Sequence, residues 1–267
     1  MRCIISVAVK NNLSGLILTI NSILKEINKE NDDFFAIDII DGLSTDGSVR
    51  YIKDLISRMG GKKLRLIEAE PKGVYNAMNI GVMARNPEDW SWHINSGDIL
   101  VADLSHIKSI LTRNNNEYDL IVGKCGIFFK ENPDYFFVKN KTNELPHQSC
   151  IYKNNLHSVY GYYNEKFVAF SDTQFLKKIN PEKILRADAI FSATYVSPEN
   201  ISRRPESMLH DMRKLDSITN LSPSMKFEFF VRMLILKIEK KIGNSFSVLL
   251  KINIQLLFGM VDIHHLK

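Results

Sequence analysis

The first hundred residues alternate apolar runs with stretches of helical periodicity, and this alternation most limits the folds open to the chain. Four runs are apolar enough to form buried strands: residues 3–9, 34–40, 64–70 and 90–94. Apolar residues recur at spacings of three and four, which is typical of helices, over residues 14–27, 46–59 and 74–85, with Ser14 as a candidate cap of the first helix. Strands that alternate with helices of this length predict an α/β fold with a Rossmann-like, mostly parallel central sheet flanked by helices.

Each of these predicted strands ends in polar residues. The four ends are Lys10-Asn11-Asn12, Asp41-Gly42, Glu70-Pro71-Lys72-Gly73 and Asn95-Ser96-Gly97-Asp98. Because parallel strands point the same way, these ends should lie side by side at one edge of the sheet, which we call the rim. Ligands of open α/β sheets bind beyond the carboxyl ends of the strands, so the sequence predicts a binding site at the rim.

The pattern changes after a predicted helix near residues 103–113. Residues 118–129 and 135–139 indicate a hairpin or a mixed extension of the sheet, and residues 167–179 indicate a strand that runs into a helix. Residues 197–206, SPENISRRPE, are polar and contain two prolines, which predicts a mobile loop or linker.

The basic excess of the chain lies in its last quarter. Residues 201–267 contain 11 of the 35 Lys and Arg residues but 6 of the 30 Asp and Glu residues, so the remainder of the chain is neutral. A uniformly basic chain would have suggested nucleic acid; this distribution predicts no nucleic-acid partner. In the tail, one predicted helix face carries Phe227, Val231, Leu234, Ile238 and Ile242, with Lys226, Lys237, Lys240 and Lys241 roughly opposite. Such a helix could lie on a membrane surface, or it could pack on the domain or against a second subunit in a homodimer.

Cysteine usage and hydropathy bear on the compartment. Cys3, Cys125 and Cys150 are odd in number and widely spaced, which favours neither a disulfide framework nor a zinc site. No stretch reaches the roughly 18–20 apolar residues of a membrane span. The expectation is a cytoplasmic protein, peripheral on the inner face of the membrane if the basic tail binds there.

Two groups near the rim suit a nucleotide. Asp41 could accept a hydrogen bond from a base N–H or a ribose hydroxyl, although an Asx turn would also use it. Ser44 and Asp46 fit the simpler role of caps on the following helix. Lys72 stands just before a helix N-terminus, where an ammonium and backbone N–H groups could bind a phosphate; a surface lysine is the plain alternative.

Asp98 is the candidate ligand for a divalent cation. Mg²⁺ favours one or two carboxylates together with substrate phosphate oxygens, so one well-placed aspartate suffices, with Asn95 and Ser96 orienting ribose or water. The same four residues also fit an ordinary turn.

Asp172 stands at the start of a predicted helix, where it could be an N-cap, a general base that takes a proton from an attacking hydroxyl, or both. His147 could be a base, a phosphate donor or a buried structural histidine. Arg203 and Arg204 could close over a diphosphate or remain solvated loop charges.

Taken in order, these motifs resemble the family 2 glycosyltransferases. The motifs are Asp41-Gly-x-Ser-Thr-Asp-Gly-Ser, Glu70-Pro-Lys-Gly-Val-Tyr-Asn-Ala-Met-Asn-x-Gly81, Asn95-Ser-Gly-Asp98, Leu145-Pro-His-Gln148 and Ser171-Asp172. The likeness extends over about residues 3–206 and is closest to the bacterial branch that builds O-antigen, capsule or exopolysaccharide repeat units.

The resemblance implies a GT-A fold, with a nucleotide-sugar-binding half over residues 1–100, an acceptor-binding half over residues 101–206 and a basic, apolar helical extension over residues 207–267. It also implies inverting transfer from a nucleotide sugar, with UDP as the usual nucleotide and Mn²⁺ or Mg²⁺ as the cofactor. By position, Asp41 would contact the uracil or ribose, Asp98 the metal, and Asp172 would be the base. Further donor contacts would be Val9, Asn11, Lys72, Asn76, Asn95, Ser96 and Gly97, and phosphate or acceptor contacts would be His147, Gln148, Arg203 and Arg204.

Three positions depart from the family pattern. Gly42 and Gly97 stand where an acidic residue is frequent, and Asn76 stands where an aspartate is usual. An inactive nucleotide-sugar-binding scaffold is therefore a rival hypothesis, and a nucleotidyltransferase is a second. Acceptors in the resembled branch are commonly saccharides on a lipid diphosphate at the inner membrane face, which would suit a basic, amphipathic tail.

Overall fold

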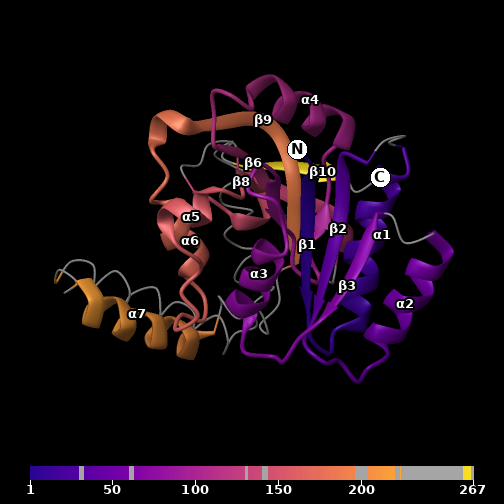
Figure 1. Cartoon of the computed structure of the whole chain (residues 1–267), viewed down its shortest axis with the longest axis horizontal. Helices are drawn as coiled ribbons and strands as arrows, with labels where there is room; N and C mark the ends of the chain where they lie inside the picture. The colour runs from indigo at the N-terminus through magenta and orange to yellow at the C-terminus, as the bar shows by residue number, and fades with distance from the viewer. Residues whose placement is uncertain are drawn as a thin grey trace.

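The computed structural model places one mixed sheet of ten strands at the centre of the molecule, with helices packed around it (Figure 1). It describes residues 1–29, 33–59, 63–129, 132–139, 144–195, 204–219, 223 and 261–265. The main path of the sheet has the strand order β10-β7-β6-β8-β4-β1-β2-β3.

The first four long strands are parallel, as the alternating pattern predicted. They are β1 (Cys3–Val9), β2 (Phe35–Asp41), β3 (Leu64–Glu68) and β4 (Trp90–His93), with β1 between β2 and β4. The intervening helices are α1 (Leu13–Ile27), α2 (Ser48–Met59) and α3 (Val74–Met83). The side chain that caps α1 is Asn12 rather than the predicted Ser14, because its Oδ1 accepts the N–H of Gly15 at 3.2 Å.

The sheet continues with antiparallel strands, which confirms the predicted mixed extension. After β5 (Ile99–Leu100) and α4 (Leu104–Asn114) come β6 (Leu120–Phe129) and β7 (Asn132–Lys139), paired as a hairpin. β8 (Cys150–Lys153) joins β4 to β6 and is antiparallel to both. The long strand β9 (Ile184–Tyr195) is parallel to β6 and antiparallel to β5.

Short helices cover the second half of the sheet. They are the 3-10 turns η1 (His147–Ser149) and η2 (Pro181–Lys183) and the helices α5 (Leu156–Tyr160) and α6 (Ser171–Leu176). The predicted strand before α6 is wrong, since residues 168–170 form bends. The N–H groups of Val168, Ala169 and Phe170 donate to the carboxylate of Asp211 at 2.8, 2.6 and 3.0 Å, and so do not pair with a strand.

Two further elements lie toward the C-terminus: α7 (Pro205–Thr219) and β10 (Val261–His265). β10 pairs antiparallel with β7 at the edge of the sheet, so the extension predicted as helical over residues 207–267 ends its described part in a strand. Val261 and Ile263 alternate with polar residues there, which suits an edge strand better than a helix. The predicted amphipathic face from Phe227 to Ile242 lies outside the described residues.

Candidate active site

The rim predicted from the strand ends exists, and the strand register explains how it forms. Val9 and Asp41 are partners at the ends of β1 and β2, and Ser6 of β1 pairs with His93 at the end of β4. The loops that follow these strands therefore start at neighbouring points. Because β8 is antiparallel to β4, the turn η1 just before β8 lies beside the residues that follow β4.

Asp41 forms the expected Asx turn with one of its two carboxylate oxygens. Its side chain is buried, and Oδ1 accepts the N–H of Ser44 at 2.7 Å, which closes an Asx turn. Its Oδ2 is also buried but has no hydrogen-bond partner among the described residues. A buried carboxylate oxygen without a donor is costly, so this atom is a place for a ligand N–H or hydroxyl.

The loops after β1 and β2 are tied together beside Asp41. The N–H of Asn11 donates to Ser44 Oγ at 2.9 Å, and Asn11 Oδ1 accepts the N–H of Thr45 at 2.8 Å. Asn11 and Leu43 have positive φ angles of 47° and 56°, a conformation that side chains adopt rarely and that clusters at functional sites. Ser44 is therefore a link between loops rather than a helix cap.

Asp46 lies in the same pair of loops. It accepts the N–H of Ser48 at 3.1 Å, as expected of a cap, and that of Leu13 at 2.7 Å. It therefore joins the start of α2 to the start of α1.

Two departures from the family pattern have physical causes in these loops. A Cβ at Gly42 would already lie 3.3 Å from side-chain atoms of Lys10 and Pro71, so a carboxylate there would need both to move. Gly97 has φ +106°, a conformation that side chains rarely adopt. The backbone of this turn therefore disfavours a second acidic residue beside Asp98.

Asp98 is held firmly at the end of that turn. Its carbonyl accepts the hydroxyl of Thr19 at 2.6 Å, and the same hydroxyl accepts the N–H of Gly97 at 2.9 Å. Its Oδ1 accepts the hydroxyl of Thr194, which follows from the pairing of Ile99 with Ala193 in β5 and β9. Gln148 of η1 in turn donates to Thr194 Oγ1 at 3.2 Å.

Among the described residues, the charge of His147 does not outweigh the burial of the Asp98 carboxylate. Its side chain is buried, and burial raises its pKa, although the Thr194 hydroxyl and the charge of His147 act in the opposite direction. A divalent cation would supply the missing positive charge. The described residues contain no group of three or more His, Cys, Asp or Glu side chains placed to hold a metal. The donor set thus fits an ion bound by Asp98 and shared with a diphosphate, rather than a site made by the protein alone.

Asp172 lies in a second, connected cluster. Its Oδ2 is 2.6 Å from His147 Nδ1, and Nε2 of the same ring is 3.0 Å from Asn95 Nδ2. Its Oδ1 accepts the hydroxyl of Tyr75 at 3.0 Å and the N–H of Thr173 at 2.8 Å. Residues of η1, α3 and α6 therefore meet at one carboxylate, and His147 links it to Asn95 of the turn after β4.

His147 and Asp172 each shift the pKa of the other toward its charged form. Burial raises the pKa of Asp172, but the charge and hydrogen bond of His147, with the donors from Thr173 and Tyr75, bring it below its usual value. Burial lowers the pKa of His147, but Asp172 and, more weakly, Asp98 bring it above its usual value. The imidazolium–carboxylate pair is therefore favoured over its neutral form.

The remaining expected contacts are less closely connected with these clusters. Val9 is buried and accepts the N–H of Gly42 at 2.9 Å through its carbonyl. Ser96 and Asn12 exchange hydrogen bonds that fix the turn to the start of α1: Ser96 Oγ donates to the Asn12 carbonyl and Asn12 Nδ2 to the Ser96 carbonyl.

Other candidates lie at the edge of the rim or beyond it. Lys72 is exposed, with Nζ 3.9 Å from Glu70. Arg204 lies exposed just before α7, and Arg203 lies outside the described residues.

Asn76 has a hydrogen-bond partner within the protein. Its Nδ2 donates to Glu165 Oε1 at 3.1 Å, and Asn79 donates to the same oxygen at 2.9 Å. An aspartate at position 76 would instead repel Glu165. The third departure from the family pattern, Asn76, therefore suits the nearby carboxylate of Glu165.

Three residues that support these clusters could not be identified from the sequence. Tyr75 lies inside a quoted motif, but nothing in the motif shows that it reaches Asp172. Thr194 and Asp211 stand in segments with no recognisable motif. Their partners are 96 and about 40 residues away along the chain, so sequence periodicity carries no sign of them.

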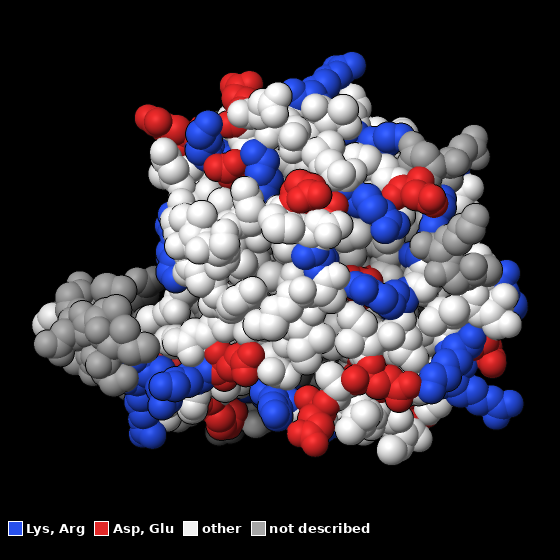
Figure 2. Space-filling model, viewed as in Figure 1, with Lys and Arg blue, Asp and Glu red and all other residues white. Residues whose placement is uncertain are grey.

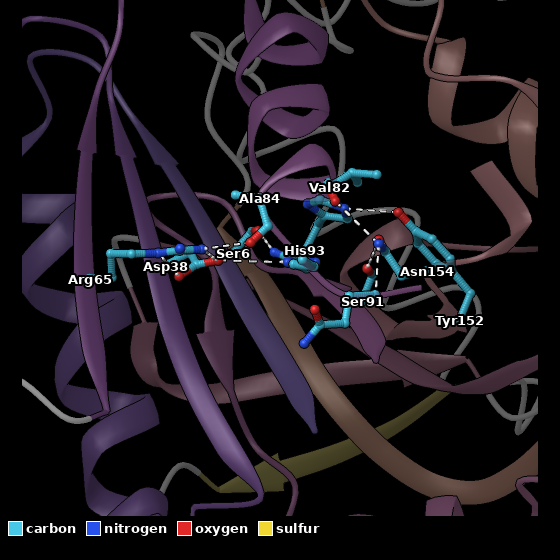
Figure 3. A network of polar contacts seen from close by, with 11 residues as sticks. Ser6, Asp38, Arg65, Val82, Ala84, Ser91, His93, Tyr152 and Asn154 are labelled. Atoms are coloured by element: carbon cyan, nitrogen blue, oxygen red, sulfur yellow. Dashed lines mark hydrogen bonds and ion pairs between the residues drawn. The ribbon is translucent and has the colours of Figure 1, made fainter. Parts of the chain in front are cut away.

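A separate polar network lies deeper in the sheet (Figure 3). Arg65 forms two hydrogen bonds with Asp38, at 2.9 and 2.8 Å, beside Ser6, and the Tyr152 hydroxyl meets the His93 ring at 2.9 Å. A cavity of about 720 Å³ borders Asp38 and Arg65 near the amino ends of β1 to β4, away from the rim. Its charges pair with each other, so it is not the candidate site.

The described residues on the face drawn in Figure 2 give no competing signal. On the face drawn in Figure 2, acidic and basic side chains of the described residues are interspersed and no large patch has one sign. Among the described helices, none has the length and hydropathy needed to cross a membrane.

Comparisons with known proteins show the family and the fold of the chain. Residues 4–180 match the family model described as glycosyl transferase family 2. None of the curated protein sequences compared with the chain matches it.

Several solved structures share the fold at low identity. Staphylococcus aureus TarS (residues 1–349), solved with UDP, has 18% identity and a TM-score of 0.58 over 88% of this chain and 71% of its own. The mannosyltransferase PcManGT from Pyrobaculum calidifontis, solved with GDP-Man and Mn²⁺, has 13% identity and a TM-score of 0.62 over 92% and 71%. GalNAc-T7, solved with UDP, GalNAc and Mn²⁺, has 10% identity and a TM-score of 0.58 over 81% and 48%.

Proposed function

Because the chain belongs to glycosyl transferase family 2 and has a GT-A fold, we propose that it transfers a sugar, with inversion, from a nucleotide-sugar donor to a hydroxyl of a lipid-linked saccharide. The observation that carries this proposal is the position of η1 between two carboxylates. His147 contacts Asp172, and the next residue, Gln148, contacts Thr194, which donates to Asp98. A group for the acceptor and a group for the donor diphosphate are thus held by adjacent residues.

The donor would lie along the rim. Asp41 Oδ2, buried and without a partner, would accept a hydrogen bond from the base or ribose. A UDP-sugar is the first candidate, in line with the UDP of TarS and GalNAc-T7, whereas PcManGT holds GDP-Man. Asp98 would hold Mn²⁺ or Mg²⁺ at the diphosphate, where the ion would offset the negative charge that develops on the leaving group.

The acceptor would approach from the side of Asp172. Its hydroxyl loses a proton as its oxygen attacks the anomeric carbon, and the bond to the diphosphate breaks on the opposite face, which inverts that centre. The step needs one proton acceptor and no covalent intermediate on the enzyme. Tyr75, Thr173 and His147 hold the Asp172 carboxylate in one orientation for this role.

The acceptor class and the location rest on the sequence of the tail. Its basic residues and single apolar stripe fit a helix that lies on the inner face of the cytoplasmic membrane, where lipid-diphosphate saccharides of bacterial surface polysaccharides are assembled. A homodimer through the same segment is the alternative use of that stripe.

The test is donor cleavage and transfer by the purified full chain with Mn²⁺ and a panel of UDP-hexoses, UDP-N-acetylglucosamine and GDP-mannose. Asp98→Asn and Asp172→Asn should each lower turnover about a hundredfold or more, because each removes a charge that acts in the transition state. Asp172→Asn should still bind UDP, measured by calorimetry.

The matched control is Asp188→Asn, which neutralises an aspartate whose side chain is 90% exposed. It should keep wild-type turnover. Cleavage of no nucleotide sugar by the wild-type protein, with UDP still bound, would favour the rival proposal of an inactive nucleotide-sugar-binding scaffold. Full turnover by Asp98→Asn would remove the metal role from that residue.

A further inference from the structure

Helix α1 has two faces that do different work. One face packs in the core, with apolar residues at spacings of four and three: Leu16, Ile20, Ile23 and Ile27. A second row lies beside it, from the N-cap onward, at spacings of three and four: Asn12, Gly15, Thr19 and Ser22. All four members of this row form hydrogen bonds with residues 95–100, which make up the turn after β4 and the start of β5. Helix α1 therefore supports the candidate metal turn as well as the core.

Thr19 is the member of this row that binds the turn on both sides of Asp98. Its side chain is fully buried, and its hydroxyl donates to the carbonyl of Asp98 at 2.6 Å and accepts the N–H of Gly97 at 2.9 Å. The hydroxyl has one hydrogen, so the carbonyl of Asn95, at 3.3 Å, is the weaker alternative acceptor. A threonine within a helix often bonds to a carbonyl of its own helix, whereas this one is committed to a distant segment.

The turn needs such support because of its own sequence. Gly97 has a φ of +106°, and a glycine on its own has many backbone conformations to lose when it is ordered. Its N–H is also 3.2 Å from the carbonyl of Gly15 on the same row of α1. The carboxylate of Asp98 accepts the hydroxyl of Thr194 through Oδ1. The main chain of Asp98 is therefore fixed from α1, and its carboxylate from β9.

On the basis of the proposed function, we propose that Thr19 is a positioning residue for the divalent cation: by holding the main chain of Gly97 and Asp98, it sets the affinity of the Asp98 carboxylate for the ion. A second carboxylate at position 97 would add negative charge to the site, and the left-handed backbone there disfavours one. A single carboxylate binds more tightly when it is already in place, because ordering it would otherwise cost part of the binding free energy. Thr19 touches neither the donor nor the ion in this assignment and acts through Asp98.

The experiment measures Mn²⁺ binding by the full chain in the presence of UDP, from the electron paramagnetic resonance signal of free Mn²⁺. Thr19→Val keeps the size of the side chain and removes the hydroxyl, so the dissociation constant for Mn²⁺ should rise about tenfold, as expected for the loss of one buried hydrogen bond. UDP binding without metal, measured by calorimetry, should not change. Donor turnover should fall at low Mn²⁺ and recover at saturating Mn²⁺, because the Asp98 carboxylate is still present.

The matched pair is Thr19→Ser and Thr19→Ala, since both lose the methyl group and only serine keeps the hydroxyl. Thr19→Ser should bind Mn²⁺ as tightly as the wild type, and Thr19→Ala as weakly as Thr19→Val. This pair decides the question even if the valine variant folds poorly. Ser91→Ala removes another fully buried hydroxyl, one that donates to Asn154 at 2.8 Å, and should leave Mn²⁺ binding unchanged.

Equal Mn²⁺ affinities of Thr19→Ser and Thr19→Ala, or wild-type affinity in Thr19→Val, would overturn the role of Thr19. Asp98→Asn separates that result from the proposed function. If the wild type binds Mn²⁺ with UDP and Asp98→Asn does not, the metal role of Asp98 stands whatever the Thr19 variants do. If the two proteins bind Mn²⁺ equally, or neither binds it, the metal role of Asp98 fails and the role of Thr19 fails with it.

Discussion

His157 shows how one buried ring couples the stability of this protein to pH. It stacks on Phe175 at 4.2 Å between ring centroids and shares a hydrogen bond of 2.9 Å with the Tyr152 hydroxyl. Burial lowers the pKa of His157 to about 4, against 6.5 for an ordinary histidine. The unfolded chain therefore binds a proton between these values that the folded protein does not.

The prediction is a loss of stability as the pH falls from 6.5 to 4, with the full contribution present above 6.5. His157 alone accounts for about 3 kcal/mol over that range, and His93, whose pKa burial also lowers, adds to the slope. Urea unfolding at several pH values measures it. His157→Gln should reduce the slope, whereas the exposed His106→Gln should keep it; an unchanged slope in His157→Gln would contradict the assignment.

At the scale of elements, α7 binds the backbone of residues 168–170, a role that its sequence does not predict. Asp211, fully buried, binds three consecutive N–H groups of residues 168–170, just before the helix that carries Asp172. The carboxylate thus replaces the strand partner that this segment lacks. We infer that α7 holds the Asp172 segment in place from outside the sheet.

Asp211→Ala should destabilise the protein by about 3 kcal/mol, because three part-buried N–H donors lose a charged acceptor. Hydrogen exchange of the amides of residues 168–170 should become faster, and turnover should fall while UDP affinity stays the same. Asp54→Asn, an exposed aspartate within α2, is the control and should change neither. Unchanged exchange at residues 168–170 in Asp211→Ala would show that the segment is held by other contacts.

At the scale of the whole molecule, the uneven charge provides a test of the proposed lipid-linked acceptor. The described face in Figure 2 carries both signs, whereas the tail holds the basic excess. Deleting the tail would also remove β10 from the edge of the sheet, so charge reversal is the cleaner test.

Lys240→Glu with Lys241→Glu should lower co-sedimentation with phosphatidylglycerol vesicles at least tenfold, since each basic residue contributes about 1 kcal/mol near an anionic surface. Lys166→Glu with Lys177→Glu, both exposed on the body, is the matched control. Equal binding of the wild type to neutral phosphatidylcholine vesicles would rule out the charge-based attachment.

The sequence alone determined the α/β fold and the rim. Strand and helix periods are local, and the parallel arrangement of residues 3–94 brings Asp41 and Asp98 to one edge whatever the remaining contacts are. The motifs also identified His147 and Asp172 as candidates. They did not show that the two touch, or that Gly97 has a left-handed backbone.

Those facts depend on the antiparallel half of the sheet. β8 returning along β4 brings η1 to Asn95, and β9 crossing β5 brings Thr194 to Asp98. Such pairings join residues far apart in the chain, and their register is set by the packing of whole strands rather than by neighbouring residues. For this reason only the tertiary structure shows that the His147 ring lies between Asn95 and Asp172.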